Sequence, residues 1–250
     1  SNKFAIKNKN HAGLRLSAMK ILVITAHPDD VDFGAGGTIA TWIAEGNEVV
    51  YCLVTDGQAG GSDNTVTREQ VAATRRREQT DAANMLGVTE LHWLGFPDGA
   101  VVADLNLRRE LSAVIRIVKP DRVLTQSAER NYSRIYASHP DHLATGEASI
   151  SAIYPDARNE FAFPELLSER GLAPHSVPET WIMAGPHPKH FVDTTDVLDK
   201  KIAALLCHAS QHTDPAGLPE RMRGWGEMIA EAGGLPKGRT AEAFLVVDTK

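Results

Sequence analysis

The sequence predicts an α/β fold: a single-domain, three-layer α/β/α sandwich around a mostly parallel, Rossmann-like sheet. Short runs rich in β-branched residues, such as 20–26 and 48–55, do not alternate between apolar and polar positions, which is typical of strands buried on both faces. Longer helical patterns separate these runs, so the first half of the chain reads β-α-β-α-β-α-β. This order implies parallel strands, right-handed crossovers and helices on both faces of the sheet.

The expected elements follow the chain in order. Gly46 and Gly87 are placed to end the first two helices, and Gly34–Gly37 is interpreted as a turn before the first helix. Residues 1–18 are polar and without periodicity, so we expect a flexible N-terminal extension followed by one domain over 19–250. The strands are predicted over 20–26, 48–55, 90–94, 122–126, 180–184, 191–192 and 244–247, and the helices over 37–45, 67–86, 105–118, 139–153, 196–210 and 221–232.

The composition limits the possible partners. The 250 residues carry a net charge of −6, and Arg75–Arg77 is the one basic cluster, which argues against a nucleic-acid-binding protein. There is no apolar run long enough to span a membrane and no secretory signal pattern. Cys52 and Cys207 fit no metal-binding spacing and suit a reducing compartment, so a cytoplasmic location is expected.

A histidine and two carboxylates come directly after the first predicted strand, where His27–Asp30 reads His-Pro-Asp-Asp. In an open α/β sheet, ligands bind outside the carboxyl ends of the strands. The motif therefore brings to that edge an imidazole and a carboxylate for a metal ion, plus a second carboxylate that can take a proton. The structural alternative is that Asp29 or Asp30 caps the next helix and His27 is an ordinary turn histidine.

A second motif, His139–His142 with the sequence His-Pro-Asp-His, follows the fourth predicted strand and opens a helical pattern. Proline suits the first turn of a helix, and residues three apart share a helix face, so both imidazoles can point at one site. The predicted topology brings both motifs to the same edge of the sheet.

Catalytic zinc sites use three nitrogen or oxygen ligands from the protein and keep a fourth position for water. The two motifs together contain such a set in His27, Asp30 and His142. Asp29 and His139 remain for proton transfer.

Several short motifs carry a resemblance to a known family. They are, in chain order, Ala26–Asp30 with Gly34–Ala40, Thr55–Gly57, Arg75–Glu78 leading to Leu86–Val88, His139–His142, His208–Gln211 and Ala241–Phe244. Together they resemble the LmbE-like/PIG-L family of zinc-dependent N-acetylglucosamine-type deacetylases. The resemblance extends from Lys20 to near the C-terminus and implies removal of an N-acyl group from an amino sugar or its conjugate.

The resemblance also implies roles for single residues. It places His27, Asp30 and His142 on the metal ion and makes Asp29 the general base. Zn²⁺ is the implied metal, with Fe²⁺ as the alternative, and the implied substrate is a small N-acylated amino sugar or glycoconjugate. A homo-oligomer is also consistent with the family.

Three further roles complete the predicted site. His139, as an imidazolium, is expected to stabilise the oxyanion or to protonate the leaving amine. Arg75 aligns with an arginine that holds substrate in some family members. Asp141 is expected to orient one imidazole by accepting a hydrogen bond from the ring nitrogen that does not bind the metal ion. The alternative is that it is only an acidic residue of the first helical turn.

Some positions depart from the family pattern or have a plain structural interpretation. Val31 stands where many members have glutamate, and Ala137 stands where some have a site tyrosine, with Tyr136 one residue earlier. Asp56 and Asp98 are interpreted as turn formers. The loop histidines His187 and His190 are left without a role.

Three alternatives to an N-deacetylase remain. An amidase that cleaves a thiol conjugate of an amino sugar would use the same groups. A nucleotide-binding domain is disfavoured, because His27–Asp30 occupies the turn where a dinucleotide-binding fingerprint has its first glycine. A catalytically silent metal-binding subunit would not need Asp29 or His139.

Overall fold

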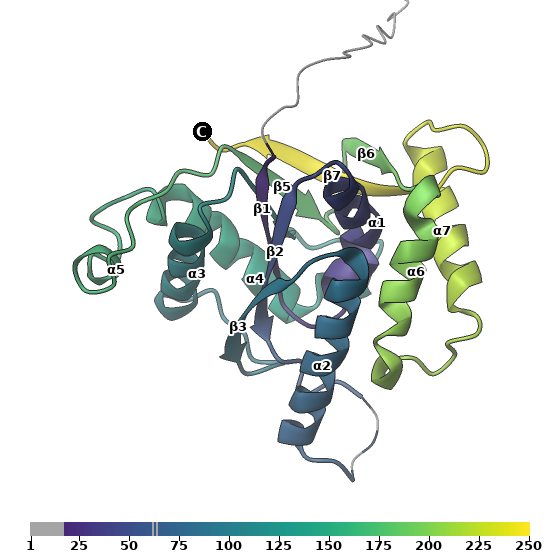
Figure 1. Ribbon diagram of the computed structural model, residues 1–250, viewed down its shortest axis with the longest axis horizontal. Helices are drawn as coiled ribbons and strands as arrows, with labels where there is room; N and C mark the ends of the chain where they lie inside the picture. The colour runs from purple at the N-terminus through teal and green to yellow at the C-terminus, as the bar shows by residue number, and fades with distance from the viewer. Residues whose placement is uncertain (1–17, 62, 64) are drawn as a thin grey trace, which may run out of the picture.

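The computed structural model describes residues 18–61, 63 and 65–250 (Figure 1). Apart from Ala18, the predicted N-terminal extension lies outside the described residues. None of the helices in the described part of the chain is long and apolar enough to span a membrane. The elements are β1 (Lys20–Thr25), α1 (Asp30–Ala44), β2 (Glu48–Thr55), α2 (Arg68–Leu86), β3 (Glu90–Phe96), α3 (Leu105–Val118), β4 (Arg122–Gln126), α4 (Pro140–Ser151), α5 (Glu165–Ser168), β5 (Glu179–Met183), β6 (His190–Asp193), α6 (Leu198–Leu206), α7 (Leu218–Ala232) and β7 (Ala241–Asp248).

Seven strands form one sheet in the order β3-β2-β1-β4-β5-β7-β6. β1 to β5 pair in parallel, and β7 runs antiparallel between β5 and β6. The chain leaves β1 toward β2 and β3 and then returns to the other side of β1 as β4. The carboxyl edge beside such a reversal is where open α/β sheets bind ligands. The predicted fold class, a mostly parallel α/β sheet, is confirmed.

The sheet is covered on both faces, as β1 illustrates. Ile21 and Val23 point into one apolar core shared with α1 and α2, whereas Leu22 and Ile24 point into a second core shared with α3 and α4. Figure 1 shows α3 and α4 to the left of the sheet and α1, α2, α6 and α7 to its right. Since both faces of β1 are buried, its residues are apolar without alternation.

Helix α1 begins earlier than predicted, at Asp30 and not at residue 37. The glycines interpreted as a turn lie inside this helix. A Cβ atom on Gly34 would lie 2.5 Å from Met183 Sδ, and one on Gly37 would lie 2.7 Å from Thr194 Cβ. These glycines therefore allow the close approach of α1 to its neighbours, and the metal-ligand candidate Asp30 stands in the first turn of a helix.

The predicted helix over 196–210 is also shorter in the structure, where α6 is followed by a 3-10 turn, Ala209–Gln211. His208 leaves helical geometry, with φ −81° and ψ 51°, and its ring turns inward to Asp32 at 2.8 Å. Recruitment of His208 into the interior thus ends the helix.

A buried ion pair ties the C-terminal strand to α1. Glu242 on β7 accepts hydrogen bonds from the backbone N–H groups of Gly37 and Thr38, at 2.9 and 2.7 Å. Lys201 Nζ on α6 lies 2.6 Å from the same carboxylate and also donates to the carbonyl oxygen of Phe33. Both charges are paired and hydrogen-bonded, which is the condition under which burial of an ion pair is tolerated.

Candidate active site

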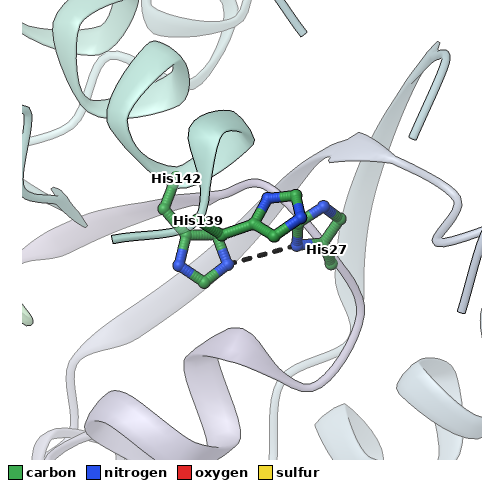
Figure 2. Close-up of side chains that lie close together, drawn as sticks. All are labelled: His27, His139 and His142. Carbon is green, nitrogen blue, oxygen red and sulfur yellow. Dashed lines mark hydrogen bonds between the residues drawn. The ribbon is translucent and has the colours of Figure 1, made fainter. Parts of the chain in front are cut away.

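The reversal between β1 and β4 brings three metal-ligand candidates within contact distance. His27 follows β1, Asp30 opens α1, and His142 lies in the first turn of α4 after β4. His27 Nδ1 lies 3.2 Å from His142 Nε2 and 3.3 Å from Asp30 Oδ2, and His142 Nε2 lies 3.0 Å from Asp30 Oδ1. Figure 2 shows the imidazoles of His27, His139 and His142 gathered at this point, with a dashed line joining His27 and His142.

The far nitrogen of each imidazole is held by a hydrogen bond. His27 Nε2 lies 3.1 Å from Asp141 Oδ2 and 3.1 Å from Asp98 Oδ1. His142 Nδ1 lies 3.3 Å from the carbonyl oxygen of Ala137. Since these partners are acceptors, each far nitrogen carries a proton, and His27 Nδ1 and His142 Nε2 are the nitrogens that face the shared centre and can bind a metal ion once they are free of protons.

This donor set fits a divalent ion. A tetrahedral zinc ion with ligands at about 2.0–2.1 Å separates neighbouring ligands by about 3.3 Å, close to the distances among His27, Asp30 and His142. The ligand atoms of His27, His139 and His142 also lie within 4.8 Å of one another, so His139 borders the same centre. The structure thus contains a His/Asp group suited to a metal ion.

A second carboxylate cluster around His27 is less suited to a metal. The ligand atoms of His27, Asp98 and Asp141 also lie within 4.8 Å. Asp141, however, accepts hydrogen bonds from the backbone N–H groups of Gly99 and Val101, at 2.7 and 3.2 Å, in addition to that from His27. Its oxygens are therefore engaged by N–H donors, and we interpret this cluster as the support of the His27 ring.

The charges at the centre shift the pKa of each ligand candidate. Burial alone would lower the pKa of His27, but the carboxylates of Asp30, Asp141 and Asp98 raise it to about 12. Burial would lower the pKa of His142, but the charge and hydrogen bond of Asp30, together with the hydrogen bond to the carbonyl oxygen of Ala137, raise it. In turn, the two imidazoles hold the pKa of Asp30 well below its usual range despite burial. The Asp30 carboxylate is thus prepared to balance a positive charge.

Asp29 occupies a different environment although it adjoins Asp30. Its backbone has φ 85° and ψ −27°, a left-handed conformation that is uncommon for a residue other than glycine and costs about 1–3 kcal/mol. Burial, followed by the charge of Asp30, raises the pKa of Asp29 to about 6, against the opposing effect of Arg75. This carboxylate therefore combines ionisation at neutral pH with appreciable basicity.

Residues from α2 hold this strained turn. Gln79 Oε1 accepts a hydrogen bond from the backbone N–H of Asp29 at 2.7 Å, and Arg75 Nη2 donates to Pro28 O at 2.7 Å and to Asp29 Oδ2 at 3.1 Å. Arg75 Nη1 also donates to the carbonyl oxygen of Gly57 at 3.0 Å. The Arg75 side chain is 6% exposed, so it lies within the protein, against Asp29. Its contact with substrate remains a prediction.

His139 is the exposed member of the histidine group and caps α4. Its Nδ1 accepts a hydrogen bond from the backbone N–H of Asp141 at 3.1 Å, which leaves the ring proton on Nε2. Burial and then the charge of His27 lower the pKa of His139. The geometry therefore favours a neutral imidazole with an Nε2–H donor over the imidazolium expected from the sequence.

Comparison with known families agrees with this arrangement. The model of the PIG-L family, described as GlcNAc-PI de-N-acetylase, matches residues 22–153, which is more than half of the 250 residues and includes both histidine motifs. The chain belongs to the PIG-L family.

Named relatives share sequence and fold with this PIG-L chain. Diacetylchitobiose deacetylase of Thermococcus kodakarensis is 35% identical over 192 residues, which are 77% of this chain and 70% of the relative. A probable N-acetyl-alpha-D-glucosaminyl L-malate deacetylase 2 of Bacillus anthracis is 28% identical over 82% of this chain and 83% of the relative. The structure of N,N'-diacetylchitobiose deacetylase from Pyrococcus horikoshii has a TM-score of 0.84 and 30% identity, covering 93% of this chain and 85% of that one.

The site of this PIG-L chain includes residues that the sequence reasoning did not select. Asp98, interpreted as a turn former, contacts His27, and its position directly after β3 at the same sheet edge was an available signal.

A buried group of polar side chains links α2 to α1 and His208. Gln79 Nε2 donates to Asp32 Oδ2 at 2.9 Å, and His208 Nε2 lies 2.8 Å from the same oxygen. No sequence spacing indicates this chain of contacts from Asp29 to His208. Asp56 instead pairs with Arg76 at 2.8 Å, away from the metal-ligand candidates.

The remaining histidines of the PIG-L chain have other surroundings. The exposed His187 lies 3.4 Å from Glu129, and the ring of His190 packs edge-on against Trp181 with centroids 4.7 Å apart. Tyr136, in contrast, lines the cleft that opens beside Asp30 and His142.

Proposed function

We propose that this chain is a metal-dependent hydrolase that removes the N-acetyl or N-acyl group from an amino sugar or an amino-sugar conjugate. One observation carries the proposal: the ligand atoms of His27, Asp30 and His142 lie 3.0–3.3 Å apart, with the carboxylate of Asp29 next to them in the chain. The relatives named as deacetylases of diacetylchitobiose and of N-acetylglucosaminyl malate support the choice of an amide bond on an amino sugar.

In this proposal His27 Nδ1, a carboxylate oxygen of Asp30 and His142 Nε2 hold the ion, with Zn²⁺ as the first choice and Fe²⁺ as the alternative. Imidazole and carboxylate ligands suit either metal. When bound, the ion would lower the pKa of its bound water to about 7 and polarise the acyl oxygen of the substrate. The hydrogen bonds to His27 and His142 keep both rings in the orientation that binding requires.

Asp29 is the proposed general base. It accepts the proton of the water that attacks the acyl carbon, and its raised pKa makes it a better acceptor than an ordinary aspartate. Asp30, whose pKa is depressed, cannot take this role. The two carboxylates thus divide ligand binding and proton transfer between them, as tuned carboxylate pairs do.

His139 is the proposed hydrogen-bond donor to the acyl oxygen of the substrate. Its Nε2–H can donate a hydrogen bond to the acyl oxygen as negative charge develops there. Only the imidazolium form of His139 could give a proton to the leaving amine; with the neutral form, the amine takes the proton that Asp29 accepted from the attacking water. The N-terminal end of α4, which begins at Pro140, adds positive potential beside the same atoms. Arg75 is proposed to orient the Asp29 carboxylate through its hydrogen bond. Direct binding of substrate by Arg75 is a second proposed role, taken from the sequence.

The proposal is tested by release of acetate from a panel of N-acetylated sugars and conjugates, with metal content measured on the same preparation. We expect acetate release and one divalent ion per chain. A chelator should remove both, and added Zn²⁺ or Fe²⁺ should restore activity. Preferential cleavage of thiol conjugates of an amino sugar would instead favour the amidase alternative. No hydrolysis of any amide by the metal-loaded protein would contradict the proposal.

A further inference from the structure

A cleft of about 500 Å³ opens beside the metal-ligand candidates and runs toward α7. Asp30 and His142 lie at one end, and Trp225 and Met228 of α7 lie on its wall. This volume is in the range of sites for small-molecule ligands. Most of its lining side chains are apolar, among them Phe33, Met183, Met222, Trp225 and Met228. A substrate with its amide at the metal centre would therefore extend along a largely apolar wall.

One cation of this wall lies close to two aromatic rings. The guanidinium carbon of Arg134 lies 4.5 Å from the ring centre of Trp225 and 5.4 Å from that of Tyr136. A guanidinium at these distances is attracted to the ring faces, and this contact leaves its N–H groups free to bind a ligand. Arg134 also borders a neighbouring cavity of about 350 Å³, so its side chain lies where the two hollows meet.

Arg134 differs from the other cations nearby in having no protein partner. Arg221 lies 2.6 Å from Asp214 Oδ2, and Lys201 lies 2.6 Å from Glu242 Oε1. Among residues 18–61, 63 and 65–250, the guanidinium of Arg134 forms no ion pair and no hydrogen bond, and its Nε is buried. A partly desolvated cation without an acceptor is unfavourable, and an anionic ligand group would relieve that cost.

We infer that Arg134 binds a carboxylate or phosphate on the part of the substrate remote from the amide, which makes acidic amino-sugar conjugates the preferred substrate class. This inference rests on the proposed N-deacetylase function and narrows it. The sugar ring packs against the apolar wall beside Trp225, and the acidic group meets the guanidinium fork. Arg134 thus determines specificity and takes no part in breaking the amide bond.

The test compares three substrates of the same anomeric configuration: N-acetylglucosamine 1-phosphate, N-acetylglucosaminyl malate and the neutral methyl N-acetylglucosaminide. We expect the wild-type protein to favour at least one acidic substrate by about tenfold in kcat/KM. Arg134→Met and Arg134→Gln should raise KM for that substrate by about the same factor, with kcat and the neutral substrate little changed. Arg134→Lys should restore part of the preference, because it retains the charge without the fork.

Arg109→Met is the matched control, because it removes one positive charge from α3, away from the cleft. It should leave the preference intact. Preference for the phosphate or for the malate alone identifies which anion fits. Equal rates with acidic and neutral substrates, or a preference that survives in both Arg134→Met and Arg134→Gln, would overturn the inference while leaving the deacetylase function in place. If none of the three substrates or the wider panel releases acetate, the proposed function itself fails.

Discussion

Asp29 and Asp30 are sequence neighbours with opposite electrostatic surroundings. Asp30 lies between two imidazoles, which depress its pKa, whereas burial and the charge of Asp30 raise the pKa of Asp29. The Asp29 carboxylate contacts Arg75, whereas that of Asp30 contacts His27 and His142. The chemical distinction between these adjacent, identical residues therefore arises from the burial and the charged neighbours of each carboxylate.

Substitution of each aspartate tests this distinction. Asp30→Ala should lose the metal ion and activity together, because a ligand is removed. Asp29→Asn is nearly isosteric and should keep the metal, while kcat falls by about 10²–10⁴-fold because the proton acceptor is lost. In the wild-type protein, kcat/KM should fall as the pH drops through the pKa of Asp29, and this acidic limb should vanish in Asp29→Asn. Metal content and rates at several pH values provide the measurement.

The outcome that contradicts this division of roles is specific. An Asp29→Asn protein that is metal-free, or metal-loaded with nearly full activity, would show that Asp29 is not the base. An Asp30→Ala protein that retains one tightly bound ion would remove Asp30 from the ligand set.

Arg75 offers a second test at the scale of a single residue. Because its guanidinium holds Asp29 and the carbonyl oxygens of Pro28 and Gly57, Arg75→Ala should lower kcat by about 10–100-fold, the usual cost of losing a group that orients a site residue. Arg77→Ala, on the exposed face of the same helix, is the control. A rise in KM with kcat unchanged would instead support the substrate contact predicted from the sequence.

At the scale of elements, the N-terminus of α1 is braced by a chain of buried hydrogen bonds. The chain runs from the backbone of Asp29 through Gln79 of α2 to Asp32, and ends at His208 after α6. His208 and Asp32 are each 0% exposed. These hydrogen bonds link α1, α2 and the segment after α6 next to Asp29, so the packing of these elements determines the position of Asp29.

The His208–Asp32 contact predicts a pH dependence of stability. Burial would lower the pKa of His208, but the hydrogen bond and charge of Asp32 raise it above the unfolded value of about 6.5. Its stabilising contribution is therefore fully present below about pH 6.5 and is lost as the pH rises through the folded-state pKa. We expect the excess free energy of unfolding of the wild-type protein over His208→Gln to shrink as the pH rises from below to above about 6.5.

Urea denaturation of both proteins across this range, with metal removed from each, measures that difference. Comparison with His208→Gln cancels the titration of the histidines at the metal centre. A difference that is constant or grows with pH would show that His208 is neutral in the folded protein.

Part of the site was predictable from sequence because it depends on topology. Adjacent parallel strands deliver His27 and His142 to one edge, so the two motifs meet however the loops are arranged. The contacts of Asp29 with Gln79 and of His208 with Asp32 join positions 50 and 176 residues apart. Such pairs depend on how whole helices pack, which local patterns do not reveal. For the same reason, the cleft along α7 and the isolation of Arg134 appear only in three dimensions.

At the scale of the whole molecule, metal uptake should be coupled to proton release. The neighbouring carboxylates raise the pKa of His27 to about 12 and also raise that of His142, so both imidazoles hold a proton more readily than an ordinary histidine before an ion binds. Binding requires His27 Nδ1 and His142 Nε2 to be free of protons, so we expect proton release on metal binding and an affinity that rises with pH. Titration calorimetry in buffers of different ionisation enthalpy counts these protons. Buffer-independent heats would contradict the expectation.

The interior position of β7 has a consequence for how the protein is made. β7 is translated after β5 and β6, yet it lies between them in the sheet and brings Glu242 to the helix that begins at Asp30. A nascent chain that stops before Ala241 leaves strand edges open on both sides of the gap, a surface prone to aggregation. The contact between Glu242 and α1 therefore forms only after β7 is translated, and until then the open strand edges are exposed to chaperones and proteases.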